Sequence, residues 1–372
     1  MNILLLEPFL SGSHQKWAEG YQSHSRHDIR LLSLKGRHWK WRMHGGAVTL
    51  AGQFSQPDWR PHLLLSTDML DVAAFLGLTR QHTAGIPAIT YFHENQITYP
   101  WSPADVDVER QRDNHYGFIN YTSALASDRV FFNSHFHRRS FLDSLPIFLK
   151  RFPDARELHR IQELEKKSNV LPLGMNLRAL GLSEKPEKYP EATLLWNHRW
   201  EYDKAPEAFF NALFRLKEEG IPFRLIVLGR SYRQSPEIFE IARHRLKEEI
   251  VHFGYAEDNT AYARLLWQAD ILPVTSRQDF FGGSVVEAIY CNCFPILPNR
   301  LAYPEHIPPA EQPLHLYEKE EEFYPKLREA VLGIEAMRRQ AAYQHFVAKY
   351  DWSILATEYD RALEQLAAQN PI

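Results

Sequence analysis

Two acidic residues frame a glycine turn in the C-terminal half of the chain. The stretch DFFGGSVVEAI places Asp279 eight positions before Glu287, with Gly282 and Gly283 between them. Glycines directly before a helix let a ligand approach the free N–H groups of its first turn, where the helix dipole favours a phosphate. Ser284 and Glu287 also fit a capping box. We therefore expect a capped helix whose N-terminus binds an anion.

Two cations follow an apolar run in the same half. Arg199 and Lys204 lie in NHRWEYDK, directly after TLLW. Two cations on one loop suit a diphosphate, because its charge is spread over several oxygens. The alternative is a solvated charged loop in which Asp203 caps the next helix.

The N-terminal half has two polar segments of its own. SGSH (11–14) follows the first apolar run, and YFHENQITYP (91–100) follows the apolar PAIT. Polar groups at the carboxyl ends of parallel strands are where α/β proteins usually bind ligands. An ordinary βα turn and a solvated loop are the alternatives.

These residues require an α/β framework to position them. Apolar runs alternate with helix-compatible segments on both sides of SEKPEKYPEA (183–192), a charged, proline-bearing stretch typical of a linker. We predict two Rossmann-like halves, with the carboxyl ends of their strands facing a shared cleft. The predicted parts are an acceptor domain 1–184, a nucleotide-sugar domain 185–350 and a final helix 351–372.

Composition excludes several classes of function. The 43 basic and 46 acidic residues give a net charge of −3, so no global attraction to nucleic acid or membrane follows. The chain has no H-E-x-x-H, C-x-x-C or G-x-S-x-G motif, so we expect neither a metal site nor a nucleophile elbow. With two cysteines, no signal-like N-terminus and no apolar run long enough to span a membrane, we expect a cytoplasmic protein.

In this order the residues resemble a retaining glycosyltransferase of the GT-B fold, family 4. DFFGGSVVE is similar to that family's E-x7-E motif, and Arg199 with Lys204 resembles its diphosphate-binding pair. FNSHFHRRSF, LPLGMN and the tail YDWSILATEYDRAL also resemble family segments, and the family's last helix crosses back to the first domain. Asp279 departs from the motif, because it is one methylene shorter than the family's glutamate.

The resemblance implies a role for each matched position. Glu287 would bind the ribose of the sugar nucleotide, Asp279 the transferred sugar, and His93 the donor sugar near its reacting carbon. The implied catalytic residues are His93, Arg199, Lys204 and Asp279. The implied donor-binding residues are Gly12, Arg199, Lys204, Gly282, Gly283, Ser284, Val285 and Glu287. No metal and no cofactor beyond a nucleotide-sugar donor is implied.

The N-terminal half resembles one particular group within this family. ILLLEPFLSGSHQKWAEGY and LKGRHWKWRMHG (34–45) closely resemble the tRNA-queuosine α-mannosyltransferase group. That implies GDP-mannose as donor and the cyclopentene hydroxyl of queuosine, in the anticodon of an aspartate tRNA, as acceptor. Alternating cations and aromatics in GRHWKWRMH suit contacts with phosphates and bases, although an amphipathic edge strand is the alternative. The expected acceptor-binding residues are His38, Trp39, Trp41, Arg42, Glu94 and Asn95, and Arg138, Arg139, Lys150 and Arg151 could extend a basic patch.

Three other functions remain open on the sequence. A family 4 enzyme could act on a lipid or glycan, for which the basic segment HFHRRSFLDSLPIFLKRF (135–152) is a candidate membrane-surface helix. A non-catalytic tRNA- or nucleotide-binding protein could keep the fold, but the intact Arg199, Lys204 and Glu287 argue against it. A dinucleotide oxidoreductase would need the glycine fingerprint, which neither half has after its first strand.

Overall fold

The chain folds into two compact units. The computed structural model describes residues 1–372 apart from 55–58, 102–106, 108–113, 230–234 and 370–372. The first unit combines Met1–Asn176 with Trp352–Ile372, and the second is Leu177–Asp351. The change of unit therefore comes earlier in the chain than the predicted boundary after residue 184.

The linker-like segment 183–192 belongs to the second unit. The Arg338 guanidinium donates hydrogen bonds to the carbonyl oxygens of Tyr189 and Glu191 at 2.8 and 3.1 Å. The Lys188 ammonium lies 3.2 Å from Asp270 Oδ1. These backbone hydrogen bonds and the Lys188 ion pair hold the segment against the unit.

A parallel sheet forms the centre of the first unit. Its described strands run in the order β2-β1-β3-β4-β5-β6. The central strands β1, β3, β4 and β5 are mostly apolar because helices cover both faces of the sheet, whereas the edge strand β2 carries exposed charged residues. The bounds are β1 Asn2–Leu10, β2 Asp28–Lys35, β3 Leu63–Thr67, β4 Ala88–Phe92, β5 Arg129–Phe132 and β6 Ser168–Val170.

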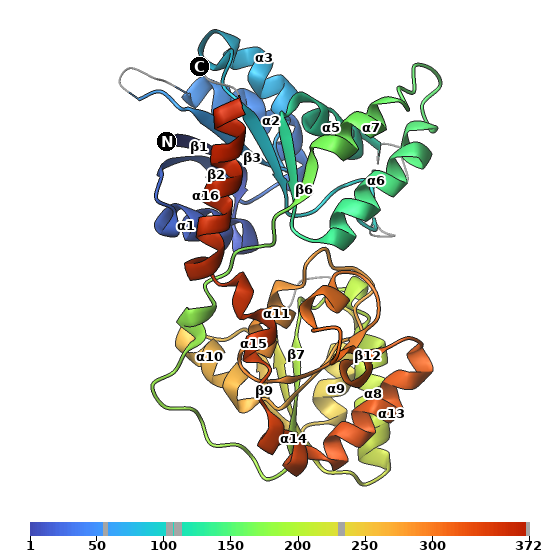
Figure 1. Ribbon diagram of the computed structural model, residues 1–372. Coiled ribbons are helices and arrows are strands. Elements are labelled where there is room, and N and C mark those ends of the chain that lie inside the picture. The colour runs from blue at the N-terminus through green and yellow to red at the C-terminus, as the bar shows by residue number, and fades with distance from the viewer. Residues whose placement is uncertain (55–58, 102–106, 108–113, 230–234, 370–372) are drawn as a thin grey trace. The chain divides into compact units, whose positions relative to one another are not determined.

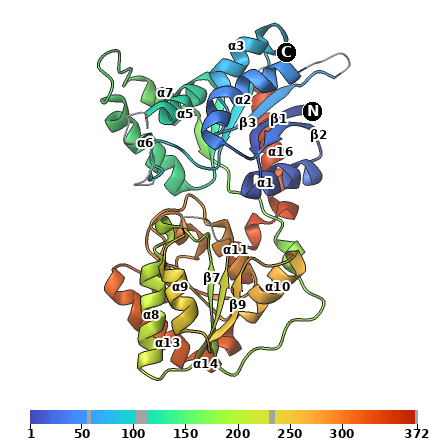
Figure 2. The same cartoon turned by 180° about the vertical axis from the view of Figure 1, so that it is seen from behind.

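Helices lie on both faces of this sheet. Figure 1 shows α16 in front of the strands, and Figure 2 shows α2, α3 and α5 on the opposite face. The bounds are α1 Gly12–His24, α2 Trp39–Gln53, α3 Val72–Thr83, α5 Asn114–Ala126, α6 His135–Leu149, α7 Arg160–Lys167 and α16 Trp352–Gln369.

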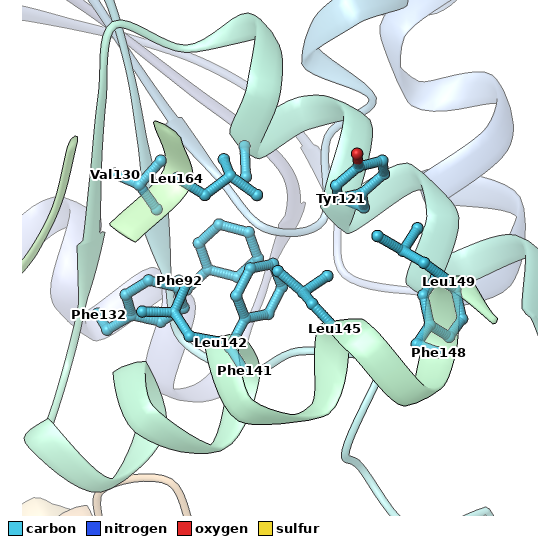
Figure 3. Packing of buried hydrophobic residues seen from close by; sticks show 11 residues of the cluster. Phe92, Tyr121, Val130, Phe132, Phe141, Leu142, Leu145, Phe148, Leu149 and Leu164 are labelled. Carbon is cyan, nitrogen blue, oxygen red and sulfur yellow. The ribbon is translucent and has the colours of Figure 1, made fainter. Parts of the chain in front are cut away.

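Aromatic rings fill the core between the sheet and α6. Figure 3 shows Phe92 and Phe132, from adjacent strands, together with Phe141 of α6. The first two rings are stacked at 5.0 Å between centroids, and Phe141 lies about equally close to both, at 5.3 and 5.2 Å. Such packing fixes the carboxyl ends of β4 and β5, from which polar residues of the site extend.

The last helix returns to the first unit, as predicted. Trp17 Nε1 of α1 donates to the Tyr359 hydroxyl of α16 at 3.1 Å, and the Tyr21 hydroxyl donates to Asp360 Oδ1 at 2.9 Å. The backbone N–H of Trp352 donates to the carbonyl of Met175 at 2.9 Å, beside the point where the chain first leaves this unit.

The second unit repeats the plan. Its described strands form a sheet in the order β12-β11-β10-β7-β8-β9, with parallel pairings throughout. The strand bounds are β7 Ala192–Asn197, β8 Phe223–Leu228, β9 Ile250–Gly254, β10 Ile271–Pro273, β11 Phe294–Pro298 and β12 Leu316–Tyr317.

Short 3₁₀ segments and helices connect these strands. Among the described residues, no helix combines the length and the apolar character needed to cross a bilayer. The α-helices are α8 Pro206–Glu218, α9 Ile238–Arg245, α10 Asn259–Gln268, α11 Gly283–Tyr290, α12 Gln312–His315, α13 Glu320–Leu332, α14 Ile334–Gln340 and α15 Gln344–Val347. The 3₁₀ segments are η1 Leu177–Leu180, η2 Tyr202–Lys204, η3 Tyr303–His306 and η4 Ala348–Tyr350.

Candidate active site

Lys204 is a buried cation in the second unit. It ends η2, which follows β7, and its side chain is 8% exposed. Its Nζ lies 3.3 Å from Asp279 Oδ2 and 3.2 Å from Asp203 Oδ2, and it donates to the carbonyl oxygen of Gln278. The fold therefore brings together two residues that the sequence singled out separately.

Asp279 is held ionised by its neighbours. Its Oδ2 also accepts a hydrogen bond from the Tyr303 hydroxyl at 3.0 Å. Burial alone would raise the pKa of the carboxyl, but the Lys204 ammonium and these hydrogen bonds outweigh burial and lower it. Nearby His198 is neutral, because burial and the charge of Lys204 lower its pKa to about 3. The site thus keeps the compact cation of Lys204 and the carboxylate of Asp279 in fixed positions.

The glycine turn begins α11 without a serine cap. Gly282 is the N-cap residue, at φ 85°, and no side chain caps this end. Ser284 therefore lies inside the first turn, and the predicted capping box is wrong. The reason is local, since glycine adopts a left-handed conformation at little cost and so starts the helix before the serine. A Cβ at Gly282 would lie 3.0 Å from the Tyr303 ring.

Glu287 binds a tyrosine instead of the helix start. Its Oε2 accepts a hydrogen bond of 2.6 Å from the Tyr262 hydroxyl of α10. Asn197, the last residue of β7, donates to that hydroxyl and to the Ser284 carbonyl, each at 2.9 Å. Burial, and then the charge of Glu287, raise the pKa of Tyr262 well above its ordinary value, so the hydroxyl stays a donor. The motif glutamate is therefore oriented from the neighbouring helix.

The other donor-side residues differ in exposure. The Arg199 side chain is 50% exposed and forms an ion pair with Glu201, with Nη1 to Oε2 at 3.2 Å. Gly283 and Ser284 are half-buried, and Val285 is buried in the first turn of α11. The Val285 N–H already donates to the Gly282 carbonyl at 2.9 Å, so the donors that this helix start offers to an anion are the N–H groups of Gly283 and Ser284.

His93 is the centre of the polar group in the first unit. It follows β4, its N–H donates to Asp68 Oδ1 at 2.7 Å, and its carbonyl accepts from Asn133 Nδ2 at 2.8 Å. The imidazole ring lies 4.2 Å, between centroids, from that of His14. Within the part of the chain that the structure describes, His93 Nε2 is buried and has no hydrogen-bond partner.

Two predicted acceptor residues support the loop after His93. Asn95 is fully buried, and its Oδ1 accepts from the N–H groups of Ile97 and Thr98 at 3.1 and 2.9 Å. Glu94 is half-buried, and its Oε1 accepts from Gln96 at 3.0 Å. Gly12 begins α1 at φ 54°, and a Cβ there would have nothing within 4 Å.

GRHWKWRMH is a loop leading into α2, so the alternative of an edge strand is wrong. His38 precedes the helix at φ 56°, and Arg42 Nε donates to the Lys35 carbonyl at 3.2 Å. The two tryptophans point to different surroundings. Trp39 packs 5.1 Å from Tyr116, whereas Trp41 is 64% exposed. In a helix, residues two positions apart point about 200° away from each other, whereas in a strand they would lie on the same face.

Comparison with known proteins identifies the family. Over 316 residues, which are 82% of this chain and 82% of the relative, the sequence is 36% identical to the tRNA-queuosine alpha-mannosyltransferase of Drosophila melanogaster. The chain belongs to the tRNA-queuosine alpha-mannosyltransferase family. The family profile described as "tRNA-queuosine alpha-mannosyltransferase N-terminal" matches residues 2–175, and that of "Glycosyl transferases group 1" matches 183–344. The chain is a glycosyltransferase.

Solved structures agree on the fold. Sucrose-phosphate synthase from Thermosynechococcus elongatus is 13% identical with a TM-score of 0.71, covering 99% of this chain and 100% of its own. A glycosyltransferase from Rickettsia africae is 14% identical with a TM-score of 0.66, covering 99% of each chain. The two Rossmann-like units of this family member therefore have the GT-B architecture.

Sequence reasoning missed several residues of the glycosyltransferase's site. Tyr262 and Tyr303 hold the two motif carboxylates, yet each lies in a segment that reads as an ordinary helix or turn. Glu7 and His14 join His93 in a cluster whose nitrogen and oxygen atoms all lie within 4.8 Å of one another, which could hold a metal ion. His14 lies in the segment SGSH, which the sequence had already singled out, whereas Glu7 stands as a lone acid within the apolar run NILLLEPFL.

Proposed function

We propose that the enzyme transfers mannose from GDP-mannose to the cyclopentene hydroxyl of queuosine in a tRNA anticodon, with retention of configuration. The observation that carries the proposal is the 36% identity to a tRNA-queuosine alpha-mannosyltransferase over most of both chains. The matching N-terminal profile covers residues 2–175, the half in which acceptor specificity is expected. A cytoplasmic location follows from the proposed substrate.

The second unit binds the donor in this proposal. The Glu287 carboxylate, oriented by Tyr262, accepts hydrogen bonds from the ribose hydroxyls. The backbone N–H groups of Gly283 and Ser284, which follow the Gly282 turn, donate hydrogen bonds to phosphate, and Val285 packs behind them in the first turn of α11. Lys204 and Arg199 stabilise the diphosphate, which gains negative charge as its bond to the sugar breaks. Asp279, ionised beside Lys204, accepts from a hydroxyl of the mannose.

The first unit binds the acceptor and one side of the sugar. His93 contacts the mannose near its anomeric carbon, with Gly12 leaving space beside it. The bond from that carbon to the diphosphate oxygen breaks as the bond to the queuosine oxygen forms on the same face. The hydroxyl proton passes to an oxygen of the leaving GDP, so neither a side-chain base nor a metal is needed. His38, Trp41 and Arg42 contact the RNA, and Trp39 and Glu94 lie beside them. Asn95 acts indirectly, because its buried side chain holds the loop after His93 in shape.

A donor and acceptor screen tests the proposal. Purified full-length chain is incubated with GDP-mannose, UDP-glucose or UDP-galactose and with aspartate tRNA that carries or lacks queuosine. We expect a mass gain of one hexose on queuosine with GDP-mannose, and none on unmodified tRNA. Transfer to a lipid or glycan in place of tRNA, or from another donor alone, would reject the corresponding half of the proposal.

A further inference from the structure

Glu7 is a carboxylate in a place suited to an apolar side chain. It lies within β1, is fully buried, and uses both oxygens. Oε2 accepts from His14 Nδ1 at 2.9 Å, and Oε1 accepts from the Phe9 N–H at 2.7 Å. A buried charge is costly to desolvate, and a well-packed hydrophobic residue often stabilises such a position at least as well. The glutamate therefore calls for a reason other than stability.

His14 connects this carboxylate to His93. The two imidazole rings lie 4.2 Å apart at an interplanar angle of 36°. The His93 ring is otherwise enclosed by Trp17 and Tyr91, at 4.8 and 5.0 Å in edge contacts. The described hydrogen bonds of His93 are made by its backbone, so ring contacts set the direction of its imidazole.

We propose that Glu7 and His14 are positioning residues for sugar transfer: the carboxylate holds His14 as an imidazolium, which braces His93 and fixes a positive charge beside it. The inference rests on the proposed function, in which His93 meets the donor sugar near its reacting carbon. A preorganised cation there stabilises the negative charge that develops on the leaving diphosphate. The proton stays on His14 throughout, so the pair takes no part in the proton transfer.

The electrostatics of the cluster agree with this division of charge. Burial would lower the pKa of His14, but the Glu7 charge and hydrogen bond outweigh it and raise the pKa to about 9. Asp68, after β3, and Glu94, beside His93, raise it further. His93 has its pKa well below the ordinary value, because of burial and then the charge of His14. At neutral pH the two adjacent imidazoles therefore differ in charge: His14 is protonated and His93 is neutral.

A metal ion is the competing explanation for the cluster. Zinc would need ligand atoms of Glu7, His14 and His93 at about 2.0–2.2 Å from one centre. The 2.9 Å hydrogen bond between Glu7 and His14 accounts for the closeness of two of those atoms without an ion. We therefore assign an ion pair.

Glu7→Gln tests the pair, because it keeps the shape and removes the charge. We expect kcat for hexose transfer to fall about 10- to 100-fold with little change in KM for GDP-mannose, as for other residues that orient a catalytic group. The basic limb of the kcat–pH profile should also move down by more than about one pH unit, since His14 loses its partner. A purely structural role would not move that limb. His14→Gln should lower kcat equally, and the double variant should add nothing.

Glu19→Gln is the matched control, because Glu19 is an exposed acid of α1 whose carboxylate accepts a hydrogen bond from Gln15 at 2.8 Å. It should leave kcat and the pH profile unchanged. Nitrogen-15 histidine NMR of the full chain, with the His14 signal assigned from His14→Gln, should show His14 protonated beyond pH 8. An unmoved basic limb in folded Glu7→Gln overturns the inference, as does one equivalent of zinc in the purified chain.

Failure of the proposed function is recognised separately. If the wild-type chain transfers nothing to queuosine tRNA, the acceptor assignment fails, and release of GDP from GDP-mannose in water becomes the measured reaction. A loss of that release in Glu7→Gln then supports the positioning pair, and an unchanged rate refutes it.

Discussion

The indole ring of Trp41 occupies space that a side chain at position 45 would fill, and it can lie there because residue 45 is glycine. A Cβ built on Gly45, one helical turn further along α2, would lie 2.8 Å from both Cε2 and Cζ2 of the indole. Real side chains do not approach that closely, so the ring lies across the bare helix backbone. One of its faces is covered, and with 64% of the residue exposed the other can stack on a nucleobase.

Gly45→Ala therefore separates stability from tRNA binding. The added methyl group should displace the indole, while alanine in a helix interior favours folding by about 1 kcal/mol over glycine. Stacking of a base on an aromatic ring contributes about 1–3 kcal/mol. Trp41→Ala should therefore raise KM for tRNA about 5- to 150-fold. Gly45→Ala should raise it less, by about 5-fold, because the displaced ring can still reach the base.

The assay is steady-state transfer to queuosine tRNA at saturating GDP-mannose and fixed salt, since RNA affinity depends on ionic strength. Thermal melting measures stability alongside. Val48→Ala is the control, because Val48 is also exposed on α2. The reasoning is refuted if Trp41→Ala leaves KM for tRNA unchanged, or if Gly45→Ala lowers stability and tRNA affinity together.

Three further predictions concern donor binding, stability and pH. Glu287→Ala should abolish saturable GDP-mannose binding in calorimetry, because it removes the carboxylate that Tyr262 orients; unchanged turnover would reject its role. Asp270→Ala should cost about 3–5 kcal/mol in denaturant unfolding, since it removes the buried carboxylate that pairs with Arg338 at 2.7 Å and with Lys188 at 3.2 Å; a midpoint like the wild type's would contradict this. The pKa of His14 is raised to about 9 and that of Asp68 to about 8, the latter mainly by burial, so the folded chain holds protons that the unfolded chain has lost. Buried histidines such as His93 and His198, whose pKa is lowered, act in the opposite direction below about pH 6.5. The unfolding free energy should therefore fall between about pH 6.5 and 9, with a smaller fall in Glu7→Gln; a rise in that range would show the sign to be wrong.

Local signals were enough to predict most of the framework. The run FPILP is β11, and the apolar runs near residues 2, 63 and 129 are β1, β3 and β5, because buried parallel strands leave a continuous hydrophobic record. The amphipathic pattern of residues 350–369 predicts the helix α16, whereas its return to the first unit followed from the family resemblance. The start of α11 was misplaced, since serine and glycine can both begin a helix and the backbone conformation decides between them.

The parts of the site that the sequence could not supply are contacts between distant segments. Tyr262 and Glu287 meet because α10 and α11 pack together, and Tyr303 reaches Asp279 from η3. Lys204 was expected on a solvated or ligand-binding loop, and its burial between two carboxylates depends on the fold of η2. Composition and periodicity do not predict contacts between distant segments. The glycines and acids of DFFGGSVVE could be recognised because they lie within one short stretch.

The return of α16 makes the first unit a domain with the second inserted into it. Trp17 and Tyr21, both buried, depend on Tyr359 and Asp360 for their hydrogen bonds. On the ribosome, at roughly 5–20 residues per second, these aromatics must wait on the order of 10 s or more while Leu177–Asp351 is made. The inserted domain can fold during that time, whereas the N-terminal half is completed only when the last helix emerges. Loss of the C-terminal helix would therefore damage the end of the chain that was synthesised first.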